Sequence, residues 1–251
     1  MHSDKPHRFE GKRYLLSGAS SGIGKSCALR LAEEGAEVVL LGRNEASLAA
    51  LRLANRARVY RVDLADEAAV KELVPRIKRE VGQLDGLVLA AGVHTFRPLL
   101  MESYANLAEP FGINVQGSLG LFALAVKHRL LAHDSSVVLF SSAAAKRGSP
   151  GTVAYAASKG AIEAATRTLA IELASQRIRV NAVAPGIVRT PMSGGFFAKL
   201  TAEQIKMLKS RHPWGFGTPE DVAGAVAFLL SSDARWIAGA VLPVDGGFAV
   251  A

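Results

Sequence analysis

The chain has 251 residues, of which 49% are hydrophobic and 21% are charged. This balance is typical of a globular protein with a sizeable core and excludes a fibrous or disordered chain. The net charge is +8, but the 30 lysine and arginine residues are scattered along the sequence rather than grouped. We therefore expect a positive surface that attracts anionic small molecules, and no nucleic-acid partner.

Cysteine usage and hydropathy limit the cellular location. Cys27 is the only cysteine, so no disulfide can form within the chain and a reducing compartment is the natural one. No apolar run approaches the ~18 residues that a membrane span needs, and the first residues lack the apolar stretch of a secretory signal. We expect a cytoplasmic protein with no membrane partner.

Short apolar runs alternate with longer amphipathic segments along the whole chain, with no repeat or linker between them. Such alternation predicts parallel strands joined by helices that cover both faces of a sheet, with ligands at the C-terminal strand ends. We predict an α/β fold, a single doubly wound domain over residues 1–251. The expected strands are Arg13–Leu16, Glu37–Leu41, Arg58–Val62, Leu84–Ala90, Ser136–Phe140, Arg179–Ala184 and Ala240–Val244.

Helical patterns fill the intervals between these strands. Asp66 has the position of an N-cap, and apolar residues follow it at helical spacing, interrupted by Pro75. We expect a kink or a late helix start there. A clear helical pattern covers residues 219–230. The least regular stretch, residues 191–214, precedes it and is predicted to be a substrate lid.

A glycine-rich turn follows the first expected strand directly. The segment Ser17–Gly24 reads SGASSGIG and leads into a helical pattern. In this context the glycines let the backbone approach a pyrophosphate, and the helix N-terminus favours the anion. The alternative is a tight turn between strand and helix that binds no ligand.

The same turn also fits G-x-S-x-G, the nucleophile elbow of serine hydrolases, with Ser20 as the nucleophile. His212 is then the conceivable base. An elbow at the first strand, without a preceding His-Gly-Gly loop, leaves Ile23 and Gly24 unexplained. The hydrolase is therefore the weaker interpretation.

The end of the second strand bears on the cofactor. An acid about 20 residues after the glycine turn binds the ribose hydroxyls of NAD, but here the strand is followed by Gly42-Arg43-Asn44. The Arg43 guanidinium suits a 2′-phosphate, so NADP(H) is the expected cofactor and NAD(H) the poorer fit. The alternative is that Arg43 is an ordinary surface arginine. Asp63, at the end of the third strand, either contacts the adenine edge or caps the next helix.

Tyr155 and Lys159 are four residues apart and share one face of a helix expected from about Ala154. A phenol with a pKa of ~10 exchanges protons poorly at pH 7, and an adjacent ammonium lowers that pKa. Ser142 ends the fifth strand at the edge where ligands bind. Its hydroxyl could bind a substrate oxygen, or it could cap the segment that follows.

Ser17–Gly24, Asn114, Ser142, Tyr155 with Lys159, and Pro185-Gly186, in this order and spacing, resemble the short-chain dehydrogenase/reductase family. The resemblance extends from about Phe9 to Ala251. It implies a Rossmann-type fold with seven parallel strands. It also implies carbonyl reduction or alcohol oxidation with NAD(P)(H).

The resemblance further implies roles for individual residues. Tyr155 exchanges the proton, while Lys159 lowers its pKa and binds the nicotinamide ribose. Ser142 orients the carbonyl, and Asn114 holds a water in a proton relay; the alternative for Asn114 is a bridge between backbone groups at a helix kink. Residues 185–190 bind the nicotinamide and its phosphate. The expected cofactor contacts are Gly18, Ser20, Ser21, Gly22, Ile23, Gly24, Arg43, Asp63, Leu64, Ala91, Gly92, Tyr155, Lys159, Pro185, Gly186, Val188 and Thr190.

Two segments depart from the family pattern. The Asn-Asn-Ala-Gly after the fourth strand is here Leu89-Ala90-Ala91-Gly92, so its asparagines are absent. The segment before the last helix, commonly Pro-Leu-Gly-Arg-x-Gly, is the shorter Pro213–Gly217 without the arginine. Both changes concern scaffold or interface, and neither removes a catalytic group.

The sequence says less about the residues that would contact the substrate. His94 either lines the site or, as we prefer, lies in a solvated loop. Lys146 and Arg147 could meet an anionic substrate tail. The expected apolar wall, which core or subunit packing would equally explain, consists of Phe96, Met192, Phe196, Phe197 and Trp214.

This part of the chain is similar to 3-oxoacyl-carrier-protein reductases among other relatives. Those commonly carry an arginine for the carrier after an Ala-Ser pair, but Ala174-Ser175 is followed here by Gln176 and Arg177. A sugar, steroid or small ketone stays open as the small-molecule substrate. Small residues on the helix after Tyr155 permit close packing between subunits, and we expect a homotetramer.

Three functional classes follow. The first is an NADP(H)-dependent carbonyl reductase with Tyr155 as its general acid and base. The second is an NADP(H)-binding sensor without turnover, which would have no need of Tyr155 and Lys159. The third is the serine hydrolase. No metal is expected, because His128 and His133 have no third ligand nearby.

Overall fold

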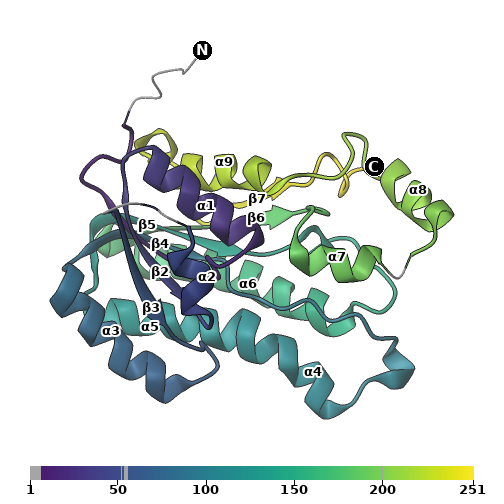
Figure 1. Cartoon of the computed structure of the whole chain (residues 1–251), viewed down its shortest axis with the longest axis horizontal. Helices are drawn as coiled ribbons and strands as arrows, with labels where there is room; N and C mark the ends of the chain where they lie inside the picture. Colours follow the sequence, from purple (N-terminus) through teal and green to yellow (C-terminus); the bar gives the residue numbers. More distant parts are fainter. Residues whose placement is uncertain (1–6, 52, 54–55, 199) are drawn as a thin grey trace.

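The computed structural model describes residues 7–51, 53, 56–198 and 200–251. One sheet of seven parallel strands crosses the molecule in the order β3-β2-β1-β4-β5-β6-β7 (Figure 1). The reversal of strand order between β1 and β4 makes it doubly wound, which confirms the predicted Rossmann-type fold. The strands are β1 Arg13–Ser17, β2 Glu37–Gly42, β3 Ala57–Arg61, β4 Leu84–Leu89, β5 Leu131–Phe140, β6 Arg179–Pro185 and β7 Val241–Val244.

The strand bounds agree with the apolar runs of the sequence, except at the start of β5. This strand begins at Leu131, five residues before the predicted start at Ser136. The added part carries the polar residues His133 and Asp134, and Asp134 has a φ of +64°. The pairing register with β4 shifts in this region, between Leu84 and Gly86. Polar residues and irregular pairing conceal this strand end from a hydrophobic pattern.

Helices cover both faces of the sheet (Figure 1). Helices α1 and α9 lie against one face, and α3, α5 and α6 lie against the other. The helix predicted at 219–230 is confirmed as α9. The helices are α1 Gly22–Glu33, α2 Glu45–Ala49, α3 Glu67–Val81, α4 Tyr104–Pro110, α5 Ser118–Lys127, α6 Val153–Glu172, α7 Pro191–Phe197, α8 Ala202–Ser210 and α9 Pro219–Leu230, with a π-helix η3 at Phe111–Gly117 and 3₁₀ turns η2 Leu99–Met101, η4 Ala143–Ala145, η5 Ala174–Gln176 and η6 Ser232–Ala234.

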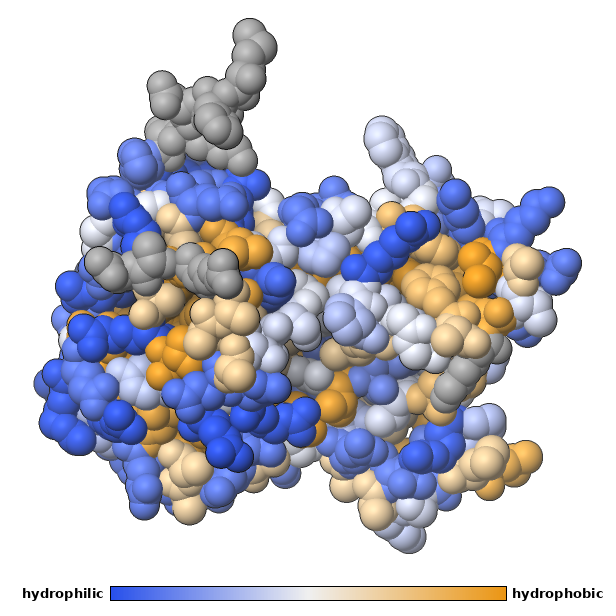
Figure 2. Space-filling view, in the orientation of Figure 1, coloured by the Kyte–Doolittle hydropathy of each residue, from blue (hydrophilic) through white to orange (hydrophobic). Residues whose placement is uncertain are grey.

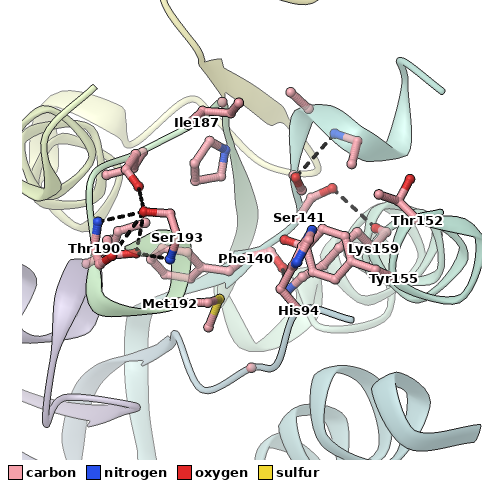
Figure 3. Close-up of a pocket in the computed structure, with 18 of the residues that line it drawn as sticks. His94, Phe140, Ser141, Thr152, Tyr155, Lys159, Ile187, Thr190, Met192 and Ser193 are labelled. Atoms are coloured by element: carbon pink, nitrogen blue, oxygen red, sulfur yellow. Dashed lines mark hydrogen bonds between the residues drawn. The ribbon is translucent and has the colours of Figure 1, made fainter. Parts of the chain in front are cut away.

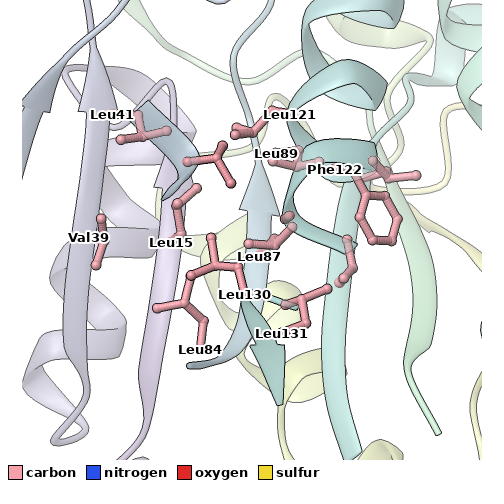
Figure 4. Packing of buried hydrophobic residues seen from close by; sticks show 14 of the residues in the cluster. Leu15, Val39, Leu41, Leu84, Leu87, Leu89, Leu121, Phe122, Leu130 and Leu131 are labelled. Carbon is pink, nitrogen blue, oxygen red and sulfur yellow. The ribbon is translucent and has the colours of Figure 1, made fainter. Parts of the chain in front are cut away.

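The core forms two apolar layers, one on each face of the sheet. Successive residues of a strand point to opposite faces, so Leu15 belongs to the layer under α3, α5 and α6, and Leu16 to the layer under α1 and α9. Both are completely buried. Figure 4 shows the first layer, where Leu87 of β4 lies near Leu130 and Leu89 lies near Leu121. Two-sided burial explains why the strands read as continuous Val and Leu runs.

Helix α3 begins where its cap predicts. The Asp66 side chain accepts a hydrogen bond from the Ala69 backbone N–H, at 3.1 Å. The expected late start at Pro75 is wrong, because the helix begins at Glu67 and continues through Pro75 to Val81. Proline lacks one backbone donor, and the buried apolar stripe of α3 outweighs that single loss.

The first helix carries the only thiol of the chain. Cys27 is 1% exposed in the layer between α1 and the sheet. Burial raises the pKa of this thiol to about 12. Because the thiolate is the reactive form, Cys27 behaves as a small apolar core residue.

The segment predicted as a lid contains α7 and α8, which lie beyond the C-terminal ends of the strands (Figure 1). Thr201 and Gln204 form a reciprocal capping box at the start of α8. Ser193 fixes the start of α7, since its hydroxyl donates to the Val188 carbonyl at 2.8 Å. Over the described residues, no helix has the length and apolar character to cross a membrane.

Candidate active site

Two adjoining cavities lie at the C-terminal edge of the sheet. The first, of about 390 Å³, is lined by the glycine turn after β1 and by the ends of β2, β3 and β4. The second, of about 260 Å³, is lined by the ends of β5 and β6, by α6 and by the lid segment. Figure 2 shows the surface hollowed between the part over α7 and α8 and the part over α4. The shared wall consists of Ile23, Ala90, Gly92, Val93, Phe140, Thr190 and Met192.

The first cavity is shaped by glycines that leave no room for a side chain. Gly18 has a φ of +68°, and a Cβ there would lie 2.7 Å from the Ala91 backbone nitrogen. A Cβ on Gly24 would overlap the Gly18 carbonyl oxygen. The backbone of this turn therefore forms an open cradle at the N-terminus of α1, which has the shape and polarity that a pyrophosphate needs. The residues present thus fit a dinucleotide.

The rim of this cavity contains Arg43 and Asp63. Both line the cavity, and Arg43 is exposed directly after β2, with Gly42 and Asn44 as its sequence neighbours. The Asp63 carboxylate accepts a hydrogen bond from the Ala65 backbone N–H, at 3.0 Å. Asp63 therefore orders the turn after β3, while the cap of α3 is Asp66. All the expected contacts from Gly18 to Gly92 line this cavity.

Asn114 is buried in the π-helix η3 behind the end of β4. Its Oδ1 accepts from the Val93 backbone N–H at 2.8 Å, and its Nδ2 donates to the Val93 carbonyl and to the Ser158 hydroxyl. The side chain thus bridges backbone groups, as the alternative interpretation held. It ties the loop after β4 to the middle of α6. It lines neither cavity, so the water relay stays a prediction.

Tyr155 faces the second cavity from the first turn of α6 (Figure 3), and Ser142 lines the same cavity. Burial raises the pKa of the Tyr155 phenol, and a hydrogen bond with Ser142 acts in the opposite direction. Ser142 also accepts a hydrogen bond from the Ala144 backbone N–H, at 3.2 Å, and so caps η4. Ser142 therefore caps this turn, as the alternative held, and its binding of a substrate oxygen stays a prediction.

Lys159 lies one turn further along α6 and is almost completely buried. Its Nζ donates to the Phe140 carbonyl at 2.9 Å and is 5.8 Å from the centre of the Tyr155 ring. Burial lowers the pKa of Lys159 to about 8, because the charged ammonium loses its hydration. At pH 7 the side chain is still mainly protonated.

The net change in the Tyr155 pKa is upward, and the lowering influence expected from Lys159 stays a prediction. The largest influence on the Tyr155 phenol is burial, and the pKa is raised. Burial disfavours both the phenolate and the ammonium, so each group is driven toward its neutral form. At neutral pH Tyr155 is therefore a proton donor, close to a positive charge.

Histidine 94 lines the second cavity, contrary to the preference for a solvated loop. Its ring packs edge-to-face on the Tyr155 ring, with centroids 4.4 Å apart. The position of His94 in the loop that follows β4 was the signal that the sequence offered. Other lining residues, such as Thr152, Leu208 and Phe248, carried no such signal.

The apolar wall is partly as expected. Phe96 and Met192 line the cavity, but Trp214 is 89% exposed and lies outside it. Phe197 packs on Phe216 instead of lining the cavity, and the side chain of Phe196 is outside the described part of the chain.

Arg147 does not face the cavity as a free cation. Its guanidinium lies over the Phe248 ring, 4.7 Å from the ring centre, and donates to the Phe248 and Ala251 carbonyls. The other neighbour of Phe248 is His212, whose ring is stacked on it at 4.2 Å. The expected role of Arg147 toward an anionic tail is therefore wrong, since its charge is used within the chain. Lys146 is exposed and does not line the cavity.

Comparison with protein families gives a match over residues 18–249 to the family described as enoyl-(acyl carrier protein) reductase. A short-chain dehydrogenase/reductase from Brucella melitensis, of the glucose/ribitol dehydrogenase type, superposes with a TM-score of 0.91 at 31% identity over 98% of this chain and 100% of that one. This chain belongs to the short-chain dehydrogenase/reductase family.

Relatives of this dehydrogenase/reductase act on several substrates. A 3-oxoacyl-[acyl-carrier-protein] reductase from Thermotoga maritima is 34% identical over 97% of this chain and 100% of its own length. A glucose 1-dehydrogenase from Gluconobacter oxydans is 36% identical over 96% and 92%. A 3-ketoacyl-(acyl-carrier-protein) reductase from Brucella melitensis, solved with NADH, has a TM-score of 0.86 at 30% identity over 96% and 100%. This chain is accordingly an oxidoreductase that uses a nicotinamide cofactor on carbonyl or alcohol groups.

The geometry of this dehydrogenase/reductase also argues against the serine hydrolase. His212 packs between Phe216 and Phe248, and its Nδ1 is 2.8 Å from the Leu208 carbonyl. Within the described residues no hydrogen bond joins it to Ser20, which lines the glycine cavity. Serine, base and acid are therefore not assembled. The described part of the chain also holds no cluster of three or more potential metal ligands of the His, Cys, Asp and Glu types.

Proposed function

We propose that this oxidoreductase reduces a small ketone with NADPH, or oxidises the matching secondary alcohol with NADP⁺, and that Tyr155 is its general acid and base. The observation that carries the proposal is the position of Tyr155 and Lys159 in the second cavity, which shares a wall with the glycine cavity. A carbonyl held there would have the phenol on one side and the glycine cradle behind the shared wall. Carbonyl reduction needs a proton donor at the oxygen and a hydride donor at the carbon of the same C=O bond.

The protein's own residues supply the proton and hold the oxygen. Ser142 binds the carbonyl oxygen, and Tyr155 donates its proton to that oxygen as the C=O double bond becomes a C–O single bond. The buried Lys159 ammonium stabilises the phenolate that is left, which then regains a proton from solvent. When bound, reduced nicotinamide supplies the hydride, with its two electrons, to the carbonyl carbon. In the reverse direction the Tyr155 phenolate accepts the alcohol proton.

The cofactor preference rests on the end of β2. Gly42 and the exposed Arg43 line the rim of the glycine cavity, and no carboxylate occupies the position that would bind the ribose hydroxyls of NAD. The guanidinium favours a 2′-phosphate through charge-assisted hydrogen bonds. The remaining assigned contacts, including Pro185, Gly186 and Val188, line the second cavity and would hold the nicotinamide.

Residues 191–214 serve in this proposal as the lid of a single-domain enzyme. Met192, Ser193 and Leu208 of this segment line the second cavity, so its closure would exclude water from the reacting carbonyl. Asn114 would hold a water of the proton relay, as the family resemblance implies.

The substrate is proposed to be a free small molecule rather than a carrier-bound acyl chain. The relative from Thermotoga maritima acts on an acyl carrier protein substrate by its name. In this chain Arg177, after the Ala174-Ser175 pair, binds the Asp134 carboxylate. That pairing leaves the arginine engaged within the protein.

A homotetramer in the reducing cytoplasm is the proposed working form. Small residues line the outward face of α6, among them Gly160, Ala161 and Ala164, and the Trp236 side chain is 96% exposed. Such surfaces are typical of subunit contacts. Light scattering should give four times the chain mass.

Cofactor binding tests the preference directly. NADPH should raise the melting temperature more than NADH, because only NADPH carries the phosphate that Arg43 binds. Arg43→Asp should narrow or reverse that difference. Arg58→Asp is a matched control, since it removes the same charge from β3 outside both cavities. Equal stabilisation of the wild type by the two cofactors would contradict the preference.

Turnover tests the mechanism. Tyr155→Phe should keep NADPH binding but lower the rate of NADPH oxidation, screened over ketones, by about 10³-fold or more, since the proton donor is lost. A sensor without turnover would oxidise no NADPH with any ketone, even with Tyr155 intact. Unchanged activity of Tyr155→Phe would remove Tyr155 from the mechanism.

A further inference from the structure

The cavity beside Tyr155 contains few polar groups that are free to meet a substrate. Ser141 donates to the Glu163 carboxylate, and Thr152 donates to the Ser149 carbonyl. Thr190 and Ser193 hydrogen-bond each other. Outside the proposed catalytic groups, two lining side chains have no hydrogen-bond partner in the described part of the chain. They are His94 and Ser149.

His94 is the one of the two that touches the proposed proton donor. The rings of His94 and Tyr155 are 4.4 Å apart between centroids, at an angle of 64°. Figure 3 shows the imidazole beside the phenol on the cavity side, where Lys159 also approaches. A substrate carbonyl that contacts the Tyr155 hydroxyl can therefore bring its neighbouring carbon within reach of the imidazole.

The imidazole is suited to an uncharged partner. Burial and the nearby Lys159 charge lower the pKa of His94, so the ring is neutral at pH 7. A neutral imidazole presents one N–H donor and one acceptor nitrogen. Such a ring can donate a hydrogen bond to a carbonyl, and it can donate to or accept from a hydroxyl. It carries no positive charge that would pair with a carboxylate.

The rest of the cavity agrees with an uncharged substrate. Lys159 is the only lining residue with a formal charge in the described part of the chain, and its ammonium already donates to the Phe140 carbonyl. Arg147 is turned toward Phe248 and the end of the described chain. A carboxylate or phosphate on the substrate would find no free cation here to offset its desolvation.

We propose that His94 binds a second oxygen of the substrate, carried on the carbon next to the reacting carbonyl. The substrate class is then an uncharged α-hydroxyketone or α-diketone in the reducing direction, and a vicinal diol in the oxidising direction. The inference rests on the proposed function, because it takes Tyr155 as the group that marks the reacting oxygen. It adds a specificity-determining residue to that site.

The test uses ring ketones that differ only in where a hydroxyl lies. With NADPH as hydride donor, kcat/KM is measured for 2-hydroxycyclohexanone and 4-hydroxycyclohexanone. The wild type should prefer the 2-hydroxy compound by about 5- to 10-fold, the value of one hydrogen bond between neutral groups. His94→Phe keeps an aromatic ring against Tyr155 but offers no hydrogen bond, and it should reduce this ratio to about 1.

Ser149→Ala is the matched control, because it removes the other unpartnered polar side chain of the cavity. It should preserve the preference for the 2-hydroxy compound. His94→Asn, which restores a donor and an acceptor without the ring, should recover part of the preference that His94→Phe loses. Melting temperatures with NADPH verify that each variant is folded and binds the cofactor.

The outcomes separate this inference from the proposed function. If the wild type reduces ketones without preference between the two isomers, or if His94→Phe keeps the wild-type ratio, the role of His94 is wrong and the reductase stands. If only Ser149→Ala loses the preference for the 2-hydroxy compound, Ser149 binds the second oxygen and the role of His94 is likewise wrong. If the wild type reduces no ketone with either nicotinamide, both are overturned.

Discussion

The two cavities are built in opposite ways. The glycine cavity is formed mostly by backbone at the ends of β1 to β4, where Gly18 and Gly24 leave no space for a Cβ. The second cavity is formed by side chains that come from distant segments, such as His94, Tyr155 and Phe248. A backbone cradle admits one kind of ligand and tolerates little change. The side chains of the second cavity can be changed one residue at a time, and each change can alter which substrate binds.

The largest effect is expected where the backbone cradle is filled. Gly24→Ala places a Cβ against the Gly18 carbonyl, so it should weaken NADPH binding by more than about 100-fold and destabilise the fold by roughly 1–3 kcal/mol. Gly120→Ala is the matched control, because a Cβ there meets nothing within 4 Å. Titration calorimetry and thermal melts measure both effects. Normal NADPH affinity in Gly24→Ala would remove the contrast between the cavities.

A second test addresses Lys159, which lines the second cavity beside Tyr155. The pKa of Lys159 is lowered to about 8, so the ammonium is present below pH 8 and lost above it. Ketone reduction should therefore fall about tenfold between pH 8 and pH 9.5, measured as kcat/KM at saturating NADPH.

The lowered pKa of Lys159 also predicts how the stability of the fold changes with pH. Because the folded chain holds this proton less tightly than the unfolded chain, the contribution of Lys159 to stability rises with pH between about 8 and 10.5. Lys159→Met should lack that rise, seen as a smaller gain in unfolding free energy over this range than in the wild type. For the preceding test, a wild-type kcat/KM for ketone reduction that stays constant up to pH 9.5 would contradict the loss of the Lys159 proton near pH 8.

A smaller effect, confined to the side-chain wall, is expected at Phe248. This ring lies between the His212 imidazole and the Arg147 guanidinium, and each such contact contributes about 1 kcal/mol. Phe248→Leu should lower stability by roughly 1–2 kcal/mol and raise KM for the ketone a few-fold. NADPH affinity should be unaffected. A parallel loss of NADPH affinity would show that the two cavities are not independent.

The smallest effect lies outside both cavities. Asp66 caps α3 on the far part of the sheet, so Asp66→Ala should cost about 1 kcal/mol of stability and leave kcat and both ligand affinities unchanged. Chemical denaturation measures the cost, with Glu67→Gln as a neighbouring control of equal charge change. A changed KM in Asp66→Ala would point to communication from α3 to the site.

Most of the sheet could be predicted because each strand is buried on both faces, and a run such as Val38–Leu41 has no other plausible location. The grouping of Ser142, Tyr155 and Lys159 could also be predicted, since strand ends and the start of α6 meet at one edge. The start of β5 could not, because polar residues there do not signal burial. The places of His94, Arg147 and Phe248 depend on contacts across up to 104 residues of sequence, which no local pattern records.

The buried Cys27 has a practical consequence. With its thiol inside the layer under α1 and its pKa raised to about 12, it should not react with maleimide probes while the protein is folded. A cysteine placed at the exposed Lys206 of α8 would then be the sole site of attachment for a fluorophore or spin label. The native thiol can be left in place, and the closure proposed for residues 191–214 can be tested in an otherwise unmodified enzyme.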